Sequence, residues 1–285
     1  MNKPFVVLEK ERDFTDVINA TFSFISQEFK LLMTVVLLYA GLPILLAAIP
    51  AALYSEDSLS NVFMAIQGQG LQQQPQFEMI IWVYGMMIIA VSIMAGLIGA
   101  YFAEYREKGH GGFTLRDVWS KFISKLGTFI LFTVVSTLII IFGTALCLIP
   151  GVYLMVPLSL GSTIIYVEGA DFGAAFDRCF KVVKDNWWIT FALILVVGII
   201  VSILGGVFSL PAMLIVLVEG VTAATGNGPT ELNSLAVIVT TVVGTIGQYL
   251  LYIISYVSIG IQFFNLKEKK DQTALFKKVS EITNE

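Results

Sequence analysis

Long apolar segments alternate with short charged segments along the chain, and this alternation predicts a bundle of membrane-spanning helices. A helix needs about 20 mainly apolar residues to cross the hydrocarbon core of a bilayer. Six segments are suitable: 31–54, 79–103, 126–148, 150–168, 188–217 and 234–265. We expect Pro157 to kink the fourth segment, and Gly205, Gly206 and Pro211 to interrupt the fifth.

Shorter amphipathic segments precede the first, third and fifth spans. Apolar residues recur there at intervals of three and four, which is typical of a helix with one apolar face. Offsets of 100 and 158 residues superpose three sets: Ile18, Val118 and Phe176; Phe22, Phe122 and Phe180; Phe29, Phe129 and Trp187. Asp13, Thr114 and Asp171 are suitable N-caps, and Asp117 forms a capping-box pattern with Thr114.

These patterns predict an all-α, polytopic membrane protein. It has six transmembrane helices plus three cytoplasmic-side interfacial amphipathic helices, arranged as three parallel helix-plus-hairpin repeats. The repeat units cover approximately residues 13–104, 113–168 and 171–266 of a single integral membrane domain, 1–285, which ends in a charged cytoplasmic tail, 267–285. Because the copies share one orientation, an axis along the membrane normal relates them.

Composition and charge agree with a membrane protein. Of the 285 residues, 56% are hydrophobic and only 13% are charged, whereas soluble domains average about 25% charged residues. This excludes an ordinary soluble enzyme, a disordered chain and a disulfide scaffold. The net charge of −4 provides no basic field for nucleic acid.

The placement of the basic residues predicts the topology. All 17 lie in four blocks, and none occurs within residues 31–105, 126–177 or 185–266. A basic side chain at the bilayer centre costs about 2.5–3.5 kcal/mol on insertion scales, so each of these stretches is predicted to be a hairpin that crosses the membrane twice. The positive-inside rule then places both termini in the cytoplasm.

Two sets of residues are candidate contact sites. The first set lies on or beside the amphipathic segments and is expected to contact lipid headgroups or a protein partner. The alternative is that these helices only cap the bundle. The residues of this set are Arg116, Lys121, Lys125, Arg178, Lys181, Lys184, Trp187 and Trp188. The second is a polar face in the last span, suited either to helix packing or to lining a site for a polar solute or lipid headgroup: Gln248, Tyr252, Ser255 and Tyr256.

Groups for catalysis are scarce. His110 is the single histidine, and no predicted span has a carboxylate near its middle, so we expect no catalytic, metal or cofactor site. Glu104 and Glu168 are expected to pair with neighbouring basic residues. In the second span small residues recur every four positions and predict close helix packing; they are Ser92, Gly96 and Ala100, and Ala95, Gly99 and Ala103.

Residues 148–154, 166–169 and 174–188 carry a family resemblance. With their proline–glycine turn and interfacial helix, they resemble the integral-membrane domain found fused to bacterial glycerophosphodiester phosphodiesterases, and related uncharacterised bacterial inner-membrane protein families. Cys179 stands where that pattern usually has serine. The resemblance implies a membrane-embedded, non-catalytic module in the bacterial inner membrane.

We therefore expect a non-enzymatic bacterial inner-membrane protein that acts as a lipid- or partner-binding scaffold, assembly or regulatory component. Its expected partners are membrane lipids and a protein in the membrane, but not nucleic acid. The alternative is a permease or channel for a neutral or amphiphilic solute, lined by the face from Gln248 to Tyr256. An intramembrane enzyme is disfavoured because candidate acid and base residues are lacking.

Overall fold

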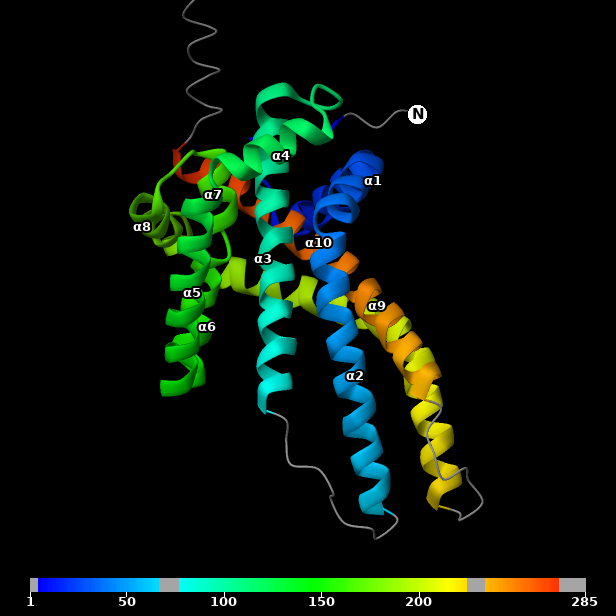
Figure 1. The fold of residues 1–285 in the computed structure, drawn as a ribbon. Helices are drawn as coiled ribbons and strands as arrows, with labels where there is room; N and C mark the ends of the chain where they lie inside the picture. Colours follow the sequence, from blue (N-terminus) through cyan, green and yellow to red (C-terminus); the bar gives the residue numbers. More distant parts are fainter. Residues whose placement is uncertain (1–4, 67–76, 225–233, 272–285) are drawn as a thin grey trace, which may run out of the picture. The chain divides into compact units, whose positions relative to one another are not determined.

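In the computed structural model, residues 5–66, 77–224 and 234–271 are described, and all regular secondary structure in these ranges is helical (Figure 1). The helices are α1 (Phe14–Tyr39), α2 (Gly41–Ile66), α3 (Phe77–Lys108), α4 (Leu115–Ser124), α5 (Leu126–Leu146), α6 (Leu148–Leu158), α7 (Gly161–Val167), α8 (Phe172–Val183), the 3₁₀ turn η1 (Lys184–Asn186), α9 (Trp187–Ala224) and α10 (Ser234–Asp271). Residues 67–76, which separate the first two predicted spans, and most of the predicted charged tail lie outside the described residues.

The prediction of an all-α protein with spanning helices is confirmed at the level of helix length and composition. Six helical stretches in the described residues are long and apolar enough to cross a membrane: Phe14–Tyr39, Ile80–Lys108, Leu126–Leu146, Leu148–Val167, Phe172–Val218 and Leu235–Lys270. Each overlaps one predicted span.

The boundaries of the first span differ from the prediction. α1 runs without a break from Phe14 to Tyr39, so its amphipathic and apolar parts form one helix. The break comes instead at Ala40, inside the predicted span 31–54. Pro43 explains it, because proline lacks an N–H and is tolerated in the first turn of a helix, where α2 places it. α2 then continues to Ile66, beyond the end of the predicted span at Tyr54.

The two proline predictions have different outcomes. The helix of the fourth span is interrupted directly after Pro157, where α6 ends at Leu158 and α7 begins at Gly161. The predicted interruption at Gly205, Gly206 and Pro211 is wrong, since α9 is continuous to Ala224. A proline inside a helix removes one backbone hydrogen bond, and the rest of a long helix retains its own.

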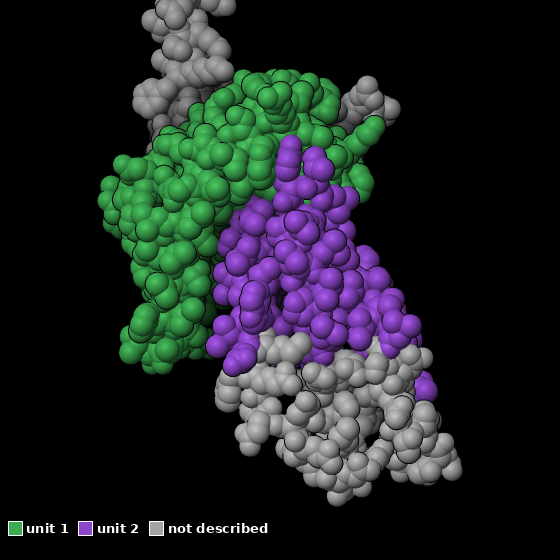
Figure 2. Space-filling model, viewed as in Figure 1, with its two compact units in different colours: residues 1–36, 94–199, 253–285 green, residues 37–93, 200–252 purple. Residues whose placement is uncertain are grey.

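The structure divides into two compact units, coloured separately in Figure 2. Unit 1 holds Met1–Val36, Met94–Ile199 and Ile253–Glu285, and unit 2 holds Leu37–Ile93 and Ile200–Tyr252.

Aromatic side chains and small residues form the core of unit 1. Phe24 of α1 packs on Phe102 and Tyr101 of α3, with ring centroids 5.0 and 6.1 Å apart. A Cβ on Gly99 of α3 would stand only 2.9 Å from the backbone oxygen of Ser162 in α7. The predicted small residues of α3 therefore permit close helix packing here.

The predicted superposition of Phe22 with Phe122 does not agree with their burial. Phe122 is buried, as is Val118, whereas Phe22 is 42% exposed. The buried face of α1 instead carries Val17 and Phe24, among others. At the offset of 100 residues, the buried positions of α1 and α4 therefore differ by one residue. One residue corresponds to a rotation of about 100° around the helix axis.

In unit 2, α9 and α10 pack against each other in antiparallel directions. Gly205 lies against Gln248, whereas Phe208, further along α9, lies against Gly244 and Gly247, earlier in α10. Glycine at these positions leaves room for the facing side chain or backbone, so the two helices approach closely.

Candidate functional site

The amphipathic helix α8 and the turn η1 that follows it present one exposed lysine each. Asp171 caps its start by accepting a hydrogen bond from the backbone N–H of Ala174 at 3.0 Å, as predicted. The buried face of the helix holds Ala175, Cys179, Val182 and Val183. Lys181 and Lys184 lie outside this face and are exposed.

After η1, an aromatic cluster marks the start of α9. The indole N–H of Trp187 donates to the backbone oxygen of Tyr153 in α6 at 3.2 Å. The Trp187 ring stacks on Tyr153 and Phe191, with centroids 5.6 and 5.3 Å away, and meets Trp188 edge to face at 4.8 Å. The hydrogen bond and stacking fix Trp187, while Trp188 remains 75% exposed.

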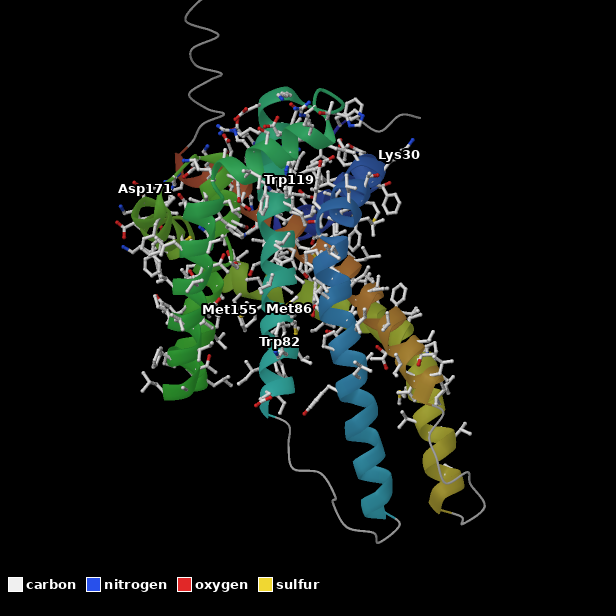
Figure 3. The ribbon with its side chains drawn as sticks, in the orientation of Figure 1. Lys30, Trp82, Met86, Trp119, Met155 and Asp171 are labelled. Atoms are coloured by element: carbon white, nitrogen blue, oxygen red, sulfur yellow. The ribbon has the colours of Figure 1, made fainter. Side chains whose placement is uncertain are left out.

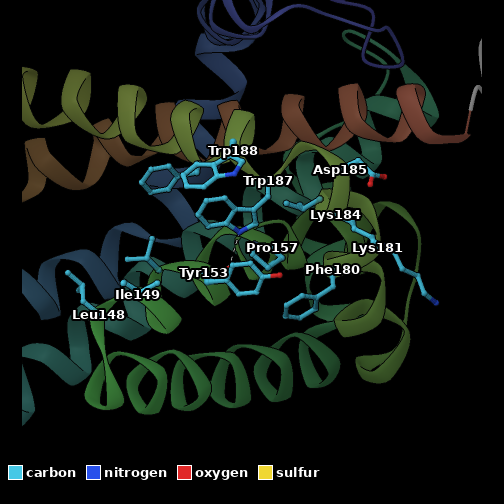
Figure 4. A pocket seen from close by; sticks show the side chains of 13 residues that line it. Leu148, Ile149, Tyr153, Pro157, Phe180, Lys181, Lys184, Asp185, Trp187 and Trp188 are labelled. Atoms are coloured by element: carbon cyan, nitrogen blue, oxygen red, sulfur yellow. Dashed lines mark hydrogen bonds between the residues drawn. The ribbon is translucent and has the colours of Figure 1, made fainter.

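A groove of about 790 Å³ lies between α6, α8 and the start of α9 (Figure 4). Its volume falls in the range of about 300–1,000 Å³ typical of small-molecule sites. Leu148 and Ile149 line one end, Tyr153, Trp187 and Trp188 line the middle, and Lys181, Lys184 and Asp185 line the other end. The groove therefore combines a long apolar wall with a basic end.

The charge at the basic end is not cancelled within the groove. Asp185 pairs with Lys270 at 3.2 Å, and Lys270 also donates to the backbone oxygen of Lys181 at 2.6 Å. Among the described residues, neither the Lys181 nor the Lys184 ammonium has a carboxylate partner. This end of the groove is consequently suited to an anionic group.

The other predicted basic residues do not reach this groove. Arg178 forms two hydrogen bonds of 3.1 Å with Glu168, Lys121 pairs with Glu107 at 2.7 Å, and Lys125 donates to the backbone oxygen of Gly169 at 2.6 Å. Arg116 is exposed on α4. Of the first predicted set, only Lys181, Lys184, Trp187 and Trp188 line the groove.

The expected pairing of the two acids is confirmed. Glu168 is held by Arg178, with Lys267 at 4.0 Å, and Glu104 pairs with Lys108 at 2.8 Å.

The predicted capping pattern at α4 is also present. The backbone N–H and the hydroxyl of Thr114 both lie 2.7 Å from the Asp117 carboxylate, and Lys108 lies 3.2 Å from it. These hydrogen bonds and the nearby cation lower the pKa of Asp117 to about 2.

The second predicted set is divided between the units. Gln248 and Tyr252 line a separate cavity of about 330 Å³ in unit 2. Ser255 and Tyr256 belong to unit 1 and are not among the residues that line it.

Sequence reasoning missed a buried polar cluster around Glu28. This carboxylate is 3% exposed, accepts a hydrogen bond of 2.5 Å from the Tyr101 hydroxyl and contacts Nδ1 of His110. The His110 ring in turn stacks on Phe5, with centroids 4.1 Å apart. Glu28 lies two helical turns after Thr21 on the buried face of α1. This spacing from Thr21 was the sequence signal that could have indicated its burial.

A second missed network links the N-terminal segment to α9 and α10. The backbone N–H of Arg12 donates to Asn265 at 2.8 Å, Asn265 donates to Gln262 at 3.1 Å, and Gln262 donates to Thr190 at 3.1 Å. The Arg12 side chain binds the backbone oxygens of Val7, Leu8 and Lys10. Burial lowers the pKa of the Arg12 guanidinium, and Asp16 partly opposes the shift.

In the parts of the chain that the structure describes, no group of three or more His, Cys, Asp or Glu side chains is placed to hold a metal ion.

The molecule is thus an all-helical protein with several helices suited to a membrane. Residues 111–265, more than half of the chain, match the model of the family described as a domain of unknown function (DUF7847), and the chain belongs to this family. The matched region contains the whole groove and the segments that carry the resemblance to the phosphodiesterase-fused membrane domain. That resemblance stays a prediction, since the family description names no activity. Comparisons with the curated proteins and with the solved structures give no match.

Proposed function

We propose that this chain is a non-enzymatic, multi-pass protein of the bacterial inner membrane, with both termini in the cytoplasm. It acts as a scaffold, assembly or regulatory component that binds an anionic membrane lipid in the groove between α6, α8 and α9. The observation that carries the proposal is that one groove holds an aromatic wall and two lysines, neither of which pairs with a carboxylate of the described residues.

The distribution of charge in unit 1 supports the membrane orientation. Its nitrogen and oxygen atoms gather near Trp119 and Asp171, at the end that carries α4 and α8, whereas apolar side chains surround Met155 (Figure 3). Basic residues near the surface of the cytoplasmic leaflet gain about 1 kcal/mol each from anionic lipids. Lys181 belongs to α8, and Lys184 follows that helix directly.

Burial supports a repeat relation between the first and third amphipathic segments. Three pairs of buried residues in α1 and α8 are 158 residues apart, as the predicted offset requires: Val17 and Ala175, Thr21 and Cys179, and Phe24 and Val182. The relation extends less well to α4, because its buried face is rotated by one residue relative to that of α1 at the offset of 100. A repeat would explain why α1, α4 and α8 each precede an apolar hairpin.

The lining of the groove fits a lipid better than a soluble metabolite. Trp188 and Ile149 are each 75% exposed, and in a bilayer such surfaces face acyl chains. Tryptophan is favoured at the level of the lipid headgroups because its ring is amphipathic. An acyl chain lying along Tyr153 and Trp187 places its headgroup phosphate beside Lys181 and Lys184.

Native mass spectrometry of the full chain tests the proposal. The protein is released from membranes containing palmitoyl-oleoyl phosphatidylglycerol and palmitoyl-oleoyl phosphatidylcholine in equal amounts, and the bound lipids are counted. We expect one phosphatidylglycerol to be retained. With about 1 kcal/mol for each lysine, the variant Lys181→Ala/Lys184→Ala should bind it about 30-fold more weakly.

The control removes the same charge elsewhere. Lys30 and Arg116 are exposed and lie outside the groove, so Lys30→Ala/Arg116→Ala should retain the lipid. Equal loss in both double variants would show general attraction to the membrane surface and contradict the proposal. Recovery of a stoichiometric protein on the groove in place of a lipid would contradict it as well.

A further inference from the structure

A second cavity, in unit 2, is distinct from the lipid groove and combines a mainly apolar lining with several polar side chains. It has a volume of about 330 Å³ and is bounded by four helices. α2 contributes Ala47, α3 contributes Met87 and α9 contributes Ser209. α10 contributes most of the polar lining, including Gln248 and Tyr249.

Hydrogen-bonding groups in this cavity lack partners within the described chain. Tyr249 is only 4% exposed, yet its hydroxyl forms no hydrogen bond with a described residue, and neither does the Gln248 amide. The Thr240 hydroxyl, in contrast, donates to the backbone of its own helix, to Ala236 at 2.7 Å. Both residues line the cavity, so a molecule bound there can supply the hydrogen bonds that the amide and the phenol do not form within the described chain.

The local sequence creates the space for the Gln248 side chain. Gly205 of α9 lies directly against the Gln248 amide, and a Cβ there would collide with it. Glycine at this position therefore lets a long polar side chain lie between two closely packed apolar helices. A glutamine used only as a polar connection between helices would be hydrogen-bonded across the interface.

We infer that this cavity binds a small uncharged molecule that carries a carboxamide, or a similar donor–acceptor pair, on an apolar body. Among the described residues that line the cavity, no side chain is charged, so an ion would lack compensation from them. The Gln248 amide can both donate to and accept from such a group, and the rings of Tyr249 and Tyr252, with centroids 5.9 Å apart, offer apolar surface. The site is independent of the proposed lipid function.

Fluorine-19 NMR of the full chain in lipid nanodiscs tests this inference, with 4-fluorobenzamide as the probe. We expect saturable binding to the unaltered protein and no saturable binding of 4-fluorotoluene, which lacks the amide. The variant Gln248→Leu keeps the side-chain size approximately and removes the amide, so it should bind the probe about tenfold more weakly.

A second variant tests the same cavity independently, in case Gln248→Leu does not fold. Ala212 lines the cavity, and Ala212→Phe should fill it and abolish probe binding. The control Thr34→Val alters an exposed residue of α1 and should bind normally. The inference is overturned if the unaltered protein shows no saturable binding, or if Gln248→Leu and Ala212→Phe both bind like it. Lipid retention tests the separate groove and does not depend on this result.

Discussion

The contact between α3 and α7 gives a sharp test of how the helices of unit 1 pack. A Cβ on Gly99 would stand 2.9 Å from the Ser162 backbone oxygen and 2.9 Å from Cδ2 of Tyr166. The tyrosine ring is itself held, because its hydroxyl donates to the Phe122 backbone oxygen at 3.2 Å. In Gly99→Ala the helices must therefore separate by a few tenths of an ångström.

The expected cost follows from two opposing effects. Overpacking of a close-packed core costs about 1–3 kcal/mol, while replacing a mid-helix glycine by alanine returns about 0.5–1 kcal/mol. From the midpoints of these two ranges the net loss is about 1 kcal/mol, and a chain of this size loses about 2–4 °C in Tm for each kcal/mol. We expect Gly99→Ala to lower the apparent Tm by about 2–4 °C.

Tryptophan fluorescence during heating of the full chain in nanodiscs measures this change. Gly85→Ala is the matched control, since it makes the same substitution in the same helix and nothing lies within 4 Å of the added methyl group. It should leave the Tm unchanged or raise it. Equal Tm values for the two variants would refute the close contact between α3 and α7.

Three further predictions concern polar contacts. Arg178→Ala should destabilise the protein by about 1.5–3 kcal/mol, because it removes both hydrogen bonds to Glu168. In denaturant unfolding, the midpoint of Arg178→Lys should fall between those of Arg178→Ala and the unaltered chain. An unchanged midpoint for Arg178→Ala would contradict this. Gln262→Leu should cost about 1–3 kcal/mol, because it removes the acceptor of the buried Asn265 side-chain amide and the donor to the Thr190 hydroxyl. A neutral effect on the same midpoint would count against the network. Asp117 stabilises the start of α4 through its carboxylate, whose pKa is lowered to about 2, so its contribution is complete above the usual carboxyl pKa near 4 and is lost as the pH falls through about 2. Asp117→Asn should therefore lower the Tm at pH 7 and match the unaltered chain at the acid end of a pH series; a constant difference across the series would show that the charge is not responsible.

The sequence predicted the features that depend on local chemistry. Helix length and hydrophobicity are local, and so are the caps at Thr114 and Asp171. Pro157, where a kink was predicted, lies at the point where α6 ends. The break at Ala40 was missed although Pro43 is a local signal, because the apolar run continues on both sides of it.

Features that depend on tertiary contacts could not be predicted in the same way. The apolar stripe of α1 contains Phe22, but the helix turns Phe24 inward because Phe24 meets the aromatic rings of α3. Similarly, Glu28 is paired with residues 73 and 82 positions away in the chain. For the candidate site, the sequence identified the lysines and tryptophans around the end of α8, but not the α6 wall that completes the groove.

The central claim is that the groove holds an anionic lipid beside Trp187 and Trp188. Tryptophan quenching by brominated lipids tests it most directly, in a full-length chain carrying Trp82→Phe and Trp119→Phe so that only the two groove tryptophans remain. In phosphatidylcholine membranes, a minor fraction of brominated phosphatidylglycerol should quench them more strongly than the same fraction of brominated phosphatidylcholine. Adding Lys181→Ala and Lys184→Ala should remove that excess, whereas equal quenching by both lipids in the chain with its lysines intact would contradict the claim.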